Sequence, residues 1–313
     1  MESLTKSHLL EWRPNAVQEI RKIYNLDMPG RIEEAINILE KWVEKQDHFV
    51  KKDFKRDYLE RTLIVCKGSV EKSKKQIDKL CTLKTLLPHF FTKTNVKSEL
   101  RDILNLGCMV PMPVMTEDFS RVIILRNSDE NLKEENITEF FQFNMILSEY
   151  LKANEYTNGI IVVFDFRQVN IINLITKINT VELQQFSSIL IEGYGVRVKG
   201  IHVLTPSKAV ELLVKLMKQF VSEKISSRIH VHNTMEEIYE YIPRELLPFD
   251  YGGNQKSFDK LSLEWVDELS GDKHVEYMKM MNKACTNESL RSKDTFNQEY
   301  MGMPGSFRNL SVD

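Results

Sequence analysis

The strongest constraint on the fold is the segment IIVVFDF at residues 160–166, which is apolar along almost its whole length. A strand with one solvated face alternates apolar and polar side chains, whereas a strand buried on both faces has a continuous apolar run. A central strand of a parallel sheet, covered by helices, has this second pattern. The segment therefore predicts an α/β fold.

Extended and helical patterns alternate on both sides of this segment. A Gly/Pro-punctuated stretch near residue 107 is expected to be extended, and apolar runs predict further strands at 122–125, 196–204 and 229–231. Helices are expected between the strands, at 136–152, roughly 170–192, 206–221 and about 234–241. Thr205 is typical of a helix cap and Pro206 of a first helical turn. Alternation of this kind favours a mainly parallel sheet.

The first third of the chain has a different pattern. Apolar residues recur at helical spacing between 32 and 43 and again between 59 and 70, so residues 1–105 are expected to form an all-helical module. The α/β domain is expected over 106–265, followed over 266–313 by a C-terminal helix and a tail that is loosely structured from 285 onward. The charged run KKDFKR at 51–56 is either a solvated helix face or a docking patch.

Composition and charge exclude several classes of function. Hydrophobic residues make up 42% and charged residues 28% of the chain, as in ordinary globular proteins. The formal net charge is −2, so the chain as a whole is not suited to nucleic acid, and we expect no such partner. Four widely spaced cysteines are expected to be reduced thiols rather than zinc ligands. Without a signal peptide or an apolar stretch of about 20 residues, we expect a cytoplasmic protein with transient, peripheral membrane contact.

A parallel sheet calls for a search for catalytic and nucleotide-binding motifs. The sequence contains no GxGxxG after a strand, no GxxxxGK[ST] and no GxSxG. His230 and His232 alternate on a predicted strand, but without a third ligand nearby they favour packing over a metal site. Asp165 ends the central strand, where it either caps a helix or makes a buried hydrogen bond, or serves a functional site. We therefore expect no enzyme, no metal site and no cofactor.

The most informative segment chemically is 197–230, which holds seven Lys and Arg residues against two acids. Arg197 and Lys199 are two residues apart and lie on the same side of an extended chain. Lys224 and Arg228 are four residues apart and share one face of a helix. If the two pairs face each other, four cations converge on one site that suits a phosphorylated lipid head group. Otherwise they form a scattered, solvated surface.

Between the two basic pairs lies an amphipathic helix. Its broad apolar face is formed by Val210, Leu213, Leu216, Met217, Phe220 and Val221. Lys208, Glu211, Lys215 and Lys218 lie largely on the other side. Such a face either covers a protein core or forms the inner surface of a lid over an apolar ligand.

Several separated segments resemble one known family. The stretch RVKGIHVLTP, the helix after it, EKISSRIHVH and IPRELLPFDYGGN occur in the order found in the CRAL-TRIO lipid-binding family. GIIVVFDF is similar to the central strand of that family, and LERTLIVCKGSVEKSKKQIDKL at 59–80 resembles its helical N-terminal module with a degenerate motif. The resemblance covers about residues 40–265 and is closest to the branch of the α-tocopherol transfer protein and the cellular retinaldehyde-binding protein. The ending GSFRNLSVD resembles insect members.

The resemblance implies a fold and a mechanism. The family has a helical N-terminal module and a lipid cage of sheet and helices, closed by a mobile gate helix that corresponds to 206–221 here. In this branch a basic cluster beside the gate binds a phosphoinositide at the membrane and promotes ligand exchange. Its positions correspond to Arg197, Lys199, Lys224 and Arg228, all of which are basic in this chain.

The resemblance also implies a set of cavity residues. On the sheet and the covering helices these are Phe143, Ile146, Phe164, Val169, Phe186, Ile189, Leu190, Tyr194, Val198 and Ile201, and the apolar face of the gate helix completes the set. The expected function is that of a carrier that encloses one hydrophobic molecule, such as a retinoid, carotenoid or tocopherol, and transfers it at membranes. The alternative is a membrane-recruited, phosphoinositide-binding adaptor without a transported ligand. The sequence names neither the ligand nor the oligomeric state.

Overall fold

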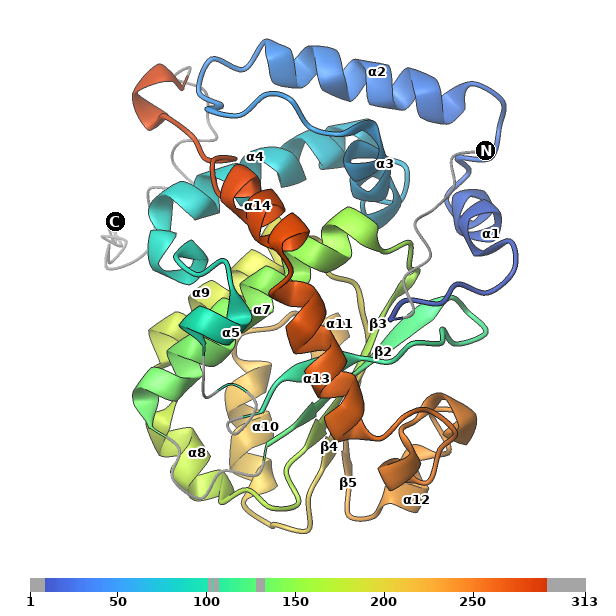
Figure 1. Cartoon of the computed structure of the whole chain (residues 1–313), viewed down its shortest axis with the longest axis vertical. Helices are drawn as coiled ribbons and strands as arrows, with labels where there is room; N and C mark the ends of the chain where they lie inside the picture. Colours follow the sequence, from blue (N-terminus) through green and yellow to red (C-terminus); the bar gives the residue numbers. More distant parts are fainter. Residues whose placement is uncertain (1–8, 101–102, 104–106, 128–132, 292–313) are drawn as a thin grey trace, which may run out of the picture.

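A computed structural model describes residues 9–100, 103, 107–127 and 133–291 of the 313-residue chain. The early helices lie at one end of a sheet, and the later helices surround the sheet or cross it (Figure 1). The first helical elements are α1 (Ala16–Ile23), α2 (Arg31–Glu44), α3 (Arg56–Val65), α4 (Val70–Leu86), η1 (Pro88–Phe91) and α5 (Val96–Glu99). This confirms the expected helical N-terminal region.

The sheet has five strands in sequential order and is parallel except at one edge. The strands are β1 (Met109–Pro111), β2 (Ser120–Arg126), β3 (Gly159–Asp165), β4 (Val198–Leu204) and β5 (Ile229–His232). Only β1 runs antiparallel to its neighbour β2, while β2 to β5 pair in parallel. The mainly parallel α/β architecture predicted from the apolar run at 160–166 is confirmed, because that run forms the central strand β3.

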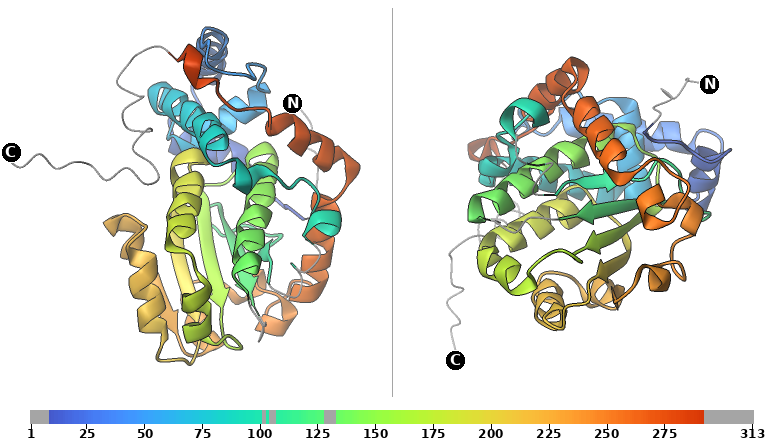
Figure 2. Two further views of the ribbon diagram at one scale, coloured as in Figure 1. Left: turned by 90° about the vertical axis from the view of Figure 1, so that its left-hand side faces the viewer. Right: turned by 60° about the horizontal axis from the view of Figure 1, so that its bottom comes forward.

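Helices follow each parallel strand, as the alternating pattern predicted. They are α7 (Glu134–Asn154), α8 (Ile171–Lys177), α9 (Thr180–Ser188), the π-helix η2 (Ile189–Gly193), α10 (Val210–Lys218), α11 (Glu223–Ser226) and α12 (Met235–Ile238). The helical segments expected over roughly 170–192 are α8, α9 and η2, and the helix expected over about 234–241 is shorter. In the left view of Figure 2, α10 lies at the outer edge of the molecule, beside the helices of the 170–192 segment.

The helix expected to begin at Pro206 begins at Val210 instead, and it ends at Lys218 rather than Val221. The cause is local side-chain chemistry. Thr205 Oγ1 accepts a hydrogen bond from the Ser207 amide, and Ser207 Oγ accepts one from the Ala209 amide. These bonds stabilise turns that compete with the first helical turn. The expectation that Thr205 caps a helix at Pro206 was wrong.

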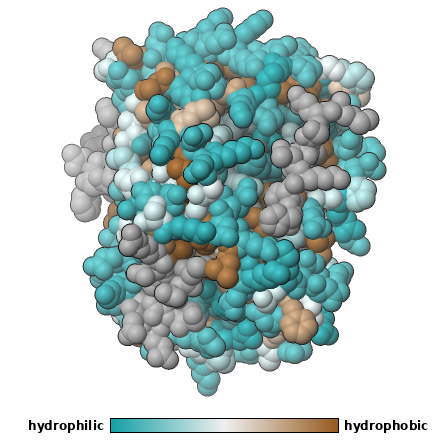
Figure 3. All heavy atoms as spheres, viewed as in Figure 1, coloured by the Kyte–Doolittle hydropathy of each residue, from teal (hydrophilic) through white to brown (hydrophobic). Residues whose placement is uncertain are grey.

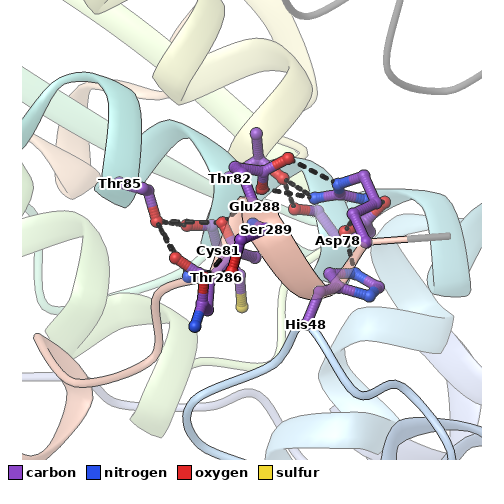
Figure 4. Close-up of polar contacts among 10 residues, drawn as sticks. His48, Asp78, Cys81, Thr82, Thr85, Thr286, Glu288 and Ser289 are labelled. Atoms are coloured by element: carbon purple, nitrogen blue, oxygen red, sulfur yellow. Dashed lines mark hydrogen bonds and ion pairs between the residues drawn. The ribbon is translucent and has the colours of Figure 1, made fainter. Parts of the chain in front are cut away.

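The end of the described chain returns to the N-terminal helices. It forms η3 (Arg244–Leu246), η4 (Phe249–Tyr251), α13 (Phe258–Leu269), α14 (Asp272–Met281) and η5 (Glu288–Leu290). The loose structure expected from residue 285 is wrong for 285–291, because Phe49 and Thr286 form a β-bridge and Arg291 pairs with Asp78 of α4. Figure 4 shows this polar network between η5, α4 and His48. The expectation for 292–313 lies outside the described residues.

Two apolar clusters hold the fold together. The larger one fills the space around the sheet and includes Phe143, Ile146 and Trp265, each fully buried. The smaller one packs α2, α3 and α4 together. The face seen in Figure 3 is mostly hydrophilic, with hydrophobic side chains in small separate groups. Among the described helices, none is both long and apolar enough to cross a lipid bilayer.

Candidate ligand-binding cavities and basic surface

An apolar cavity of about 140 Å³, called the gate-side cavity below, lies between the sheet and helices α7 to α10. It is lined by Leu125, Asn127, Asn136, Ile137, Phe140, Phe141, Phe164, Phe166, Leu174, Ile178, Leu183, Phe186, Leu213 and Met217. Two asparagines are the only polar residues in this lining, and the rings of Phe141 and Phe186 stack at 4.4 Å between centroids. The surface favours an apolar guest.

Helix α10 closes one side of the gate-side cavity with its apolar face. Leu213 and Met217 line the cavity, and Leu213 is only 3% exposed. Leu212 on the opposite face of the helix is 58% exposed. The amphipathic pattern of α10 therefore has a structural explanation, since one face meets the cavity and the other meets solvent. A displacement of α10 would open the cavity directly.

A second cavity of about 120 Å³, called the inner cavity below, lies near the N-terminal ends of β2 and β3. Its apolar wall is formed by Ile64, Val65, Met109, Ile123, Leu147, Leu151, Ile160, Leu190, Tyr194 and Val196, with Gly159. Its polar wall is formed by Arg61, Arg121, Asn144, Ser148, Lys152, Glu155, Thr157 and Arg197. The inner cavity is therefore amphipathic, and cations predominate among its charged groups.

The two cavities lie one after the other along α7. The residues of α7 that line the gate-side cavity fall between 136 and 141, and the residues of α7 that line the inner cavity, together with Glu155 directly after the helix, fall between 144 and 155. At a rise of 1.5 Å per residue, the centres of these two sets are roughly 16 Å apart. Each cavity is smaller than the roughly 300–1,000 Å³ typical of small-molecule pockets, so an enclosed ligand must either span both or expand them.

A basic surface depression of about 470 Å³, called the basic basin below, lies beside the inner cavity. Four lysines from α4 and the loop before it border the basin, and these are Lys67, Lys72, Lys75 and Lys79. Arg197 borders both the basin and the inner cavity, while Glu192 is the one acid in the basin's lining and pairs with Lys79 at 3.0 Å. The excess of cations suits an anionic group at this surface.

Comparison with known families agrees with this architecture. The CRAL/TRIO domain profile matches residues 109–253, and the profile described as "Pinta-like, UBA domain" matches residues 28–100. Together these two matches cover well over half of the chain, and the first contains the whole sheet. Residues 109–253, just under half of the chain, are a CRAL/TRIO domain.

Two curated proteins and one solved structure are similar to this chain at low sequence identity. The chain is 25% identical to the "Alpha-tocopherol transfer protein-like" proteins of Mus musculus, over 61% of this chain and 56% of that one, and of Homo sapiens, over 60% and 56%. The chain thus matches little more than half the length of these relatives. The "Crystal structure of Sfh5" aligns with 83% of this chain and 99% of that chain, with 12% identity and a TM-score of 0.44.

The cavity residues inferred from the CRAL-TRIO resemblance occupy several different positions. Phe164, Phe186, Leu213 and Met217 line the gate-side cavity, and Leu190 and Tyr194 line the inner cavity. The others are buried in the main core or packed against it, or lie at the end of the gate segment, and line neither cavity; these are Phe143, Ile146, Val169, Ile189, Val198, Ile201, Val210, Leu216, Phe220 and Val221.

Three of the four basic residues inferred from the resemblance contact separate partners, and the fourth is exposed. Arg197 stacks on the ring of Tyr24 at 4.4 Å and donates a hydrogen bond to its hydroxyl. Lys199 Nζ lies 3.5 Å from a carboxylate oxygen of Asp118. Arg228 donates to the Val198 carbonyl, which ties α11 to the start of β4, the strand that follows Arg197. Lys224 lies on the exposed side of α11.

Of the polar wall of the inner cavity, the sequence had pointed to Arg197 alone. Arg61, Arg121, Lys152 and Glu155 belong to three different elements and have no common spacing. Arg121 on a strand and Lys152 near a helix end are typical of solvated positions. The one available signal was Arg121, a charged residue directly before the apolar run of β2, where burial requires a partner.

The histidines and Asp165 considered from the sequence have structural partners. His230 and His232 share a face of β5, and His232 Nε2 lies 2.9 Å from His202 Nδ1. Among the described residues, no group of three or more His, Cys, Asp or Glu side chains is arranged to hold a metal ion. Asp165 accepts two hydrogen bonds from the Arg167 side chain and one from Tyr251. Burial alone would raise its pKa, but these bonds lower it.

Proposed function

We propose that this CRAL-TRIO protein is a non-catalytic carrier that encloses one hydrophobic molecule and transfers it at membranes. The observation that carries the proposal is the gate-side cavity, an almost wholly apolar space covered by the inner face of α10. Empty apolar cavities destabilise a fold, whereas an apolar guest restores the missing contacts. The names of the relatives, which refer to a tocopherol transfer protein, support the same class of ligand.

The energy of burial is sufficient for tight binding. A ligand that transfers a few hundred Å² of apolar surface from water gains roughly 5–10 kcal/mol at about 25 cal/mol per Å², before the cost of ordering. Tight binding makes spontaneous release slow. A carrier therefore needs a second signal, given at the destination, that favours an open state.

Helix α10 and its surroundings supply features suited to such a signal. Leu212 of α10 and Ile172 of α8 are exposed by 58% and 61%, and the two helices pack against each other. Exposed apolar side chains of this kind can enter the interfacial region of a bilayer. We propose that Lys199, Lys224 and Arg228 bind a phosphoinositide head group at the same time, and that Arg197, which borders both the basin and the inner cavity, adds its positive charge to this surface. Simultaneous contact would bias α10 towards its open position.

The first experiment asks whether the protein carries a ligand. Purified full-length protein is extracted into organic solvent, the extract is analysed by mass spectrometry, and the protein is then titrated with retinoids, carotenoids, tocopherols, sterols and phospholipids. One bound lipophile per chain, or saturable uptake of one of these, is the expected result. Failure of every compound to bind would overturn the carrier function and leave the phosphoinositide-binding adaptor as the remaining hypothesis.

The second experiment tests the proposed phosphoinositide site, called the basic patch below, which includes Lys199, Lys224 and Arg228. Lys224→Glu is expected to reduce ligand exchange from phosphatidylcholine vesicles containing 5% phosphatidylinositol 4,5-bisphosphate by about tenfold, through loss of attraction and added repulsion. Ligand affinity in solution should be unchanged. Lys41→Glu on the exposed side of α2 makes the same charge change away from the patch and serves as the control. Unchanged exchange by Lys224→Glu would exclude the patch.

A further inference from the structure

Most charged groups around the inner cavity are paired. Arg121 Nε donates to Glu155 at 2.7 Å, and Trp12 Nε1 donates to the other oxygen of the same carboxylate, also at 2.7 Å. Arg61 donates to Asp57 at 2.8 Å and to the backbone carbonyls of Lys152 and Ala153. These two arginines and the single carboxylate of the lining therefore already make hydrogen bonds to other groups of the protein.

Two cations of the same lining have buried donors without an acceptor. Lys152 is 8% exposed, and its ammonium nitrogen lies 5.4 Å from the centroid of the Tyr58 ring but makes no hydrogen bond in the described part of the chain. Nε and Nη2 of Arg197, both of which are shielded from solvent, likewise make no hydrogen bond there. Burial lowers the pKa of Lys152 to about 8, so the amine remains largely protonated at neutral pH. Both side chains line the inner cavity.

Glu149, the buried carboxylate that interacts electrostatically with Lys152, is already paired with other groups. Glu149, one turn earlier on α7, is fully buried and pairs with Lys84 at 3.0 Å. It also accepts hydrogen bonds from the hydroxyls of Tyr194 at 2.9 Å and Tyr277 at 3.4 Å. A buried cation without a partner destabilises a protein by several kcal/mol unless something else supplies the counter-charge.

From this juxtaposition we propose that the inner cavity binds the carboxylate of a single-chain lipid, with Lys152 and Arg197 as its two donors. The proposal rests on the carrier function and assigns the chemical class of the ligand. A cavity of about 120 Å³ holds roughly four water volumes of about 30 Å³ each, which suits a carboxylate and the first methylenes of a chain. The hydrocarbon tail then follows α7 to the gate-side cavity, roughly 16 Å away.

The decisive measurement compares two probes that differ only at the head group. Full-length protein, stripped of lipid, is titrated with hexadecanoic acid and with hexadecanol at pH 7. We expect the acid to bind at least about tenfold more tightly, as charge-assisted hydrogen bonds to a buried cation require. Equal affinities would overturn the carboxylate assignment while leaving the carrier function intact. If neither probe binds and the lipophile screen is also negative, the carrier function itself fails.

Variants identify the residues responsible. Lys152→Met keeps the length of the side chain and removes its charge, and it should reduce acid affinity by about tenfold while alcohol affinity stays within about twofold. Arg197→Met should act in the same direction. Lys41→Met on α2 is the control for charge removal, and thermal unfolding confirms that each variant folds. A preference for the acid that survives both Lys152→Met and Arg197→Met would overturn the assignment of these donors.

Discussion

At the scale of single residues, the contacts between buried polar side chains cannot be predicted from the pattern of apolar positions. Arg291 is 8% exposed and its guanidinium donates to both oxygens of Asp78, at 2.9 and 2.7 Å, and to Thr82. Asp78 also meets the ring of His48 at 2.9 Å. The bonded residues Asp78 and Arg291 are 213 positions apart in the sequence, and nothing in their local spacing predicts that they meet.

Removal of one member of this network should be costly. Arg291→Met leaves the buried carboxylate of Asp78 without its main partner, and we expect the free energy of unfolding to fall by about 3 kcal/mol. Chemical denaturation followed by circular dichroism measures the change. Lys283→Met, a nearby exposed lysine, should stay within about 0.5 kcal/mol of the wild type. A similarly small effect for Arg291→Met would show that the network contributes little.

Two buried histidines predict how stability depends on pH. Burial lowers the pKa of His202 to about 4, with a further contribution from His232 and His230, and burial likewise lowers the pKa of His274 to about 4. Between pH 6.5 and about pH 4 these two histidines are protonated in the unfolded chain but remain neutral in the folded chain. The free energy of unfolding should therefore decrease across this window, by up to about 3 kcal/mol for each histidine.

A variant tests this pH dependence directly. His274→Leu should flatten the decrease in unfolding free energy between pH 6.5 and pH 4, because one site of differential protonation is gone. His89→Gln changes an exposed histidine and should leave the slope as it is. Denaturation series at several pH values provide the measurement, and identical slopes for His274→Leu and the wild type would contradict the assignment.

At the scale of elements, the positions of the strands were predicted more closely than the bounds of helix α10. The strand β3 follows from its apolar composition alone, because only a position covered on both faces accepts that run. The start of α10 was misplaced by four residues, because the Ala209 amide donates to the Ser207 hydroxyl instead of to the Thr205 carbonyl, its acceptor in a helix that starts at Pro206. Propensity alone does not reveal which of two such arrangements the tertiary structure selects.

The exposed apolar residues of α10 and α8 give an element-scale prediction. Leu212→Asp and Ile172→Asp should each reduce association with phosphoinositide-containing vesicles, because a carboxylate opposes both insertion and the anionic surface. Stability should change by no more than about 0.5 kcal/mol, since both side chains are exposed. Val181→Asp on α9, which is 51% exposed, is the matched control. Vesicle co-sedimentation distinguishes the three variants.

At the scale of the whole molecule, the family resemblance indicated the architecture but not the cavities. Part of the apolar cavity lining could be predicted by matching positions of this chain to the family, as Phe164, Phe186 and Leu213 illustrate. The polar wall could not, because Lys152 becomes buried only where α3, α7 and η2 meet. The contact between α3, α7 and η2 depends on the docking of the N-terminal helices onto the sheet domain, and local sequence patterns do not predict that docking.

The docking of residues 285–291 onto α4 also has a consequence during protein synthesis. Asp78 and His48 leave the ribosome early, yet the arginine that completes their network is translated about two hundred residues later. Until then the nascent N-terminal helices hold a buried acid without its cation, and they present an unfinished surface to chaperones. Although this region is made first, it can complete its native hydrogen bonds only after Arg291 has been translated.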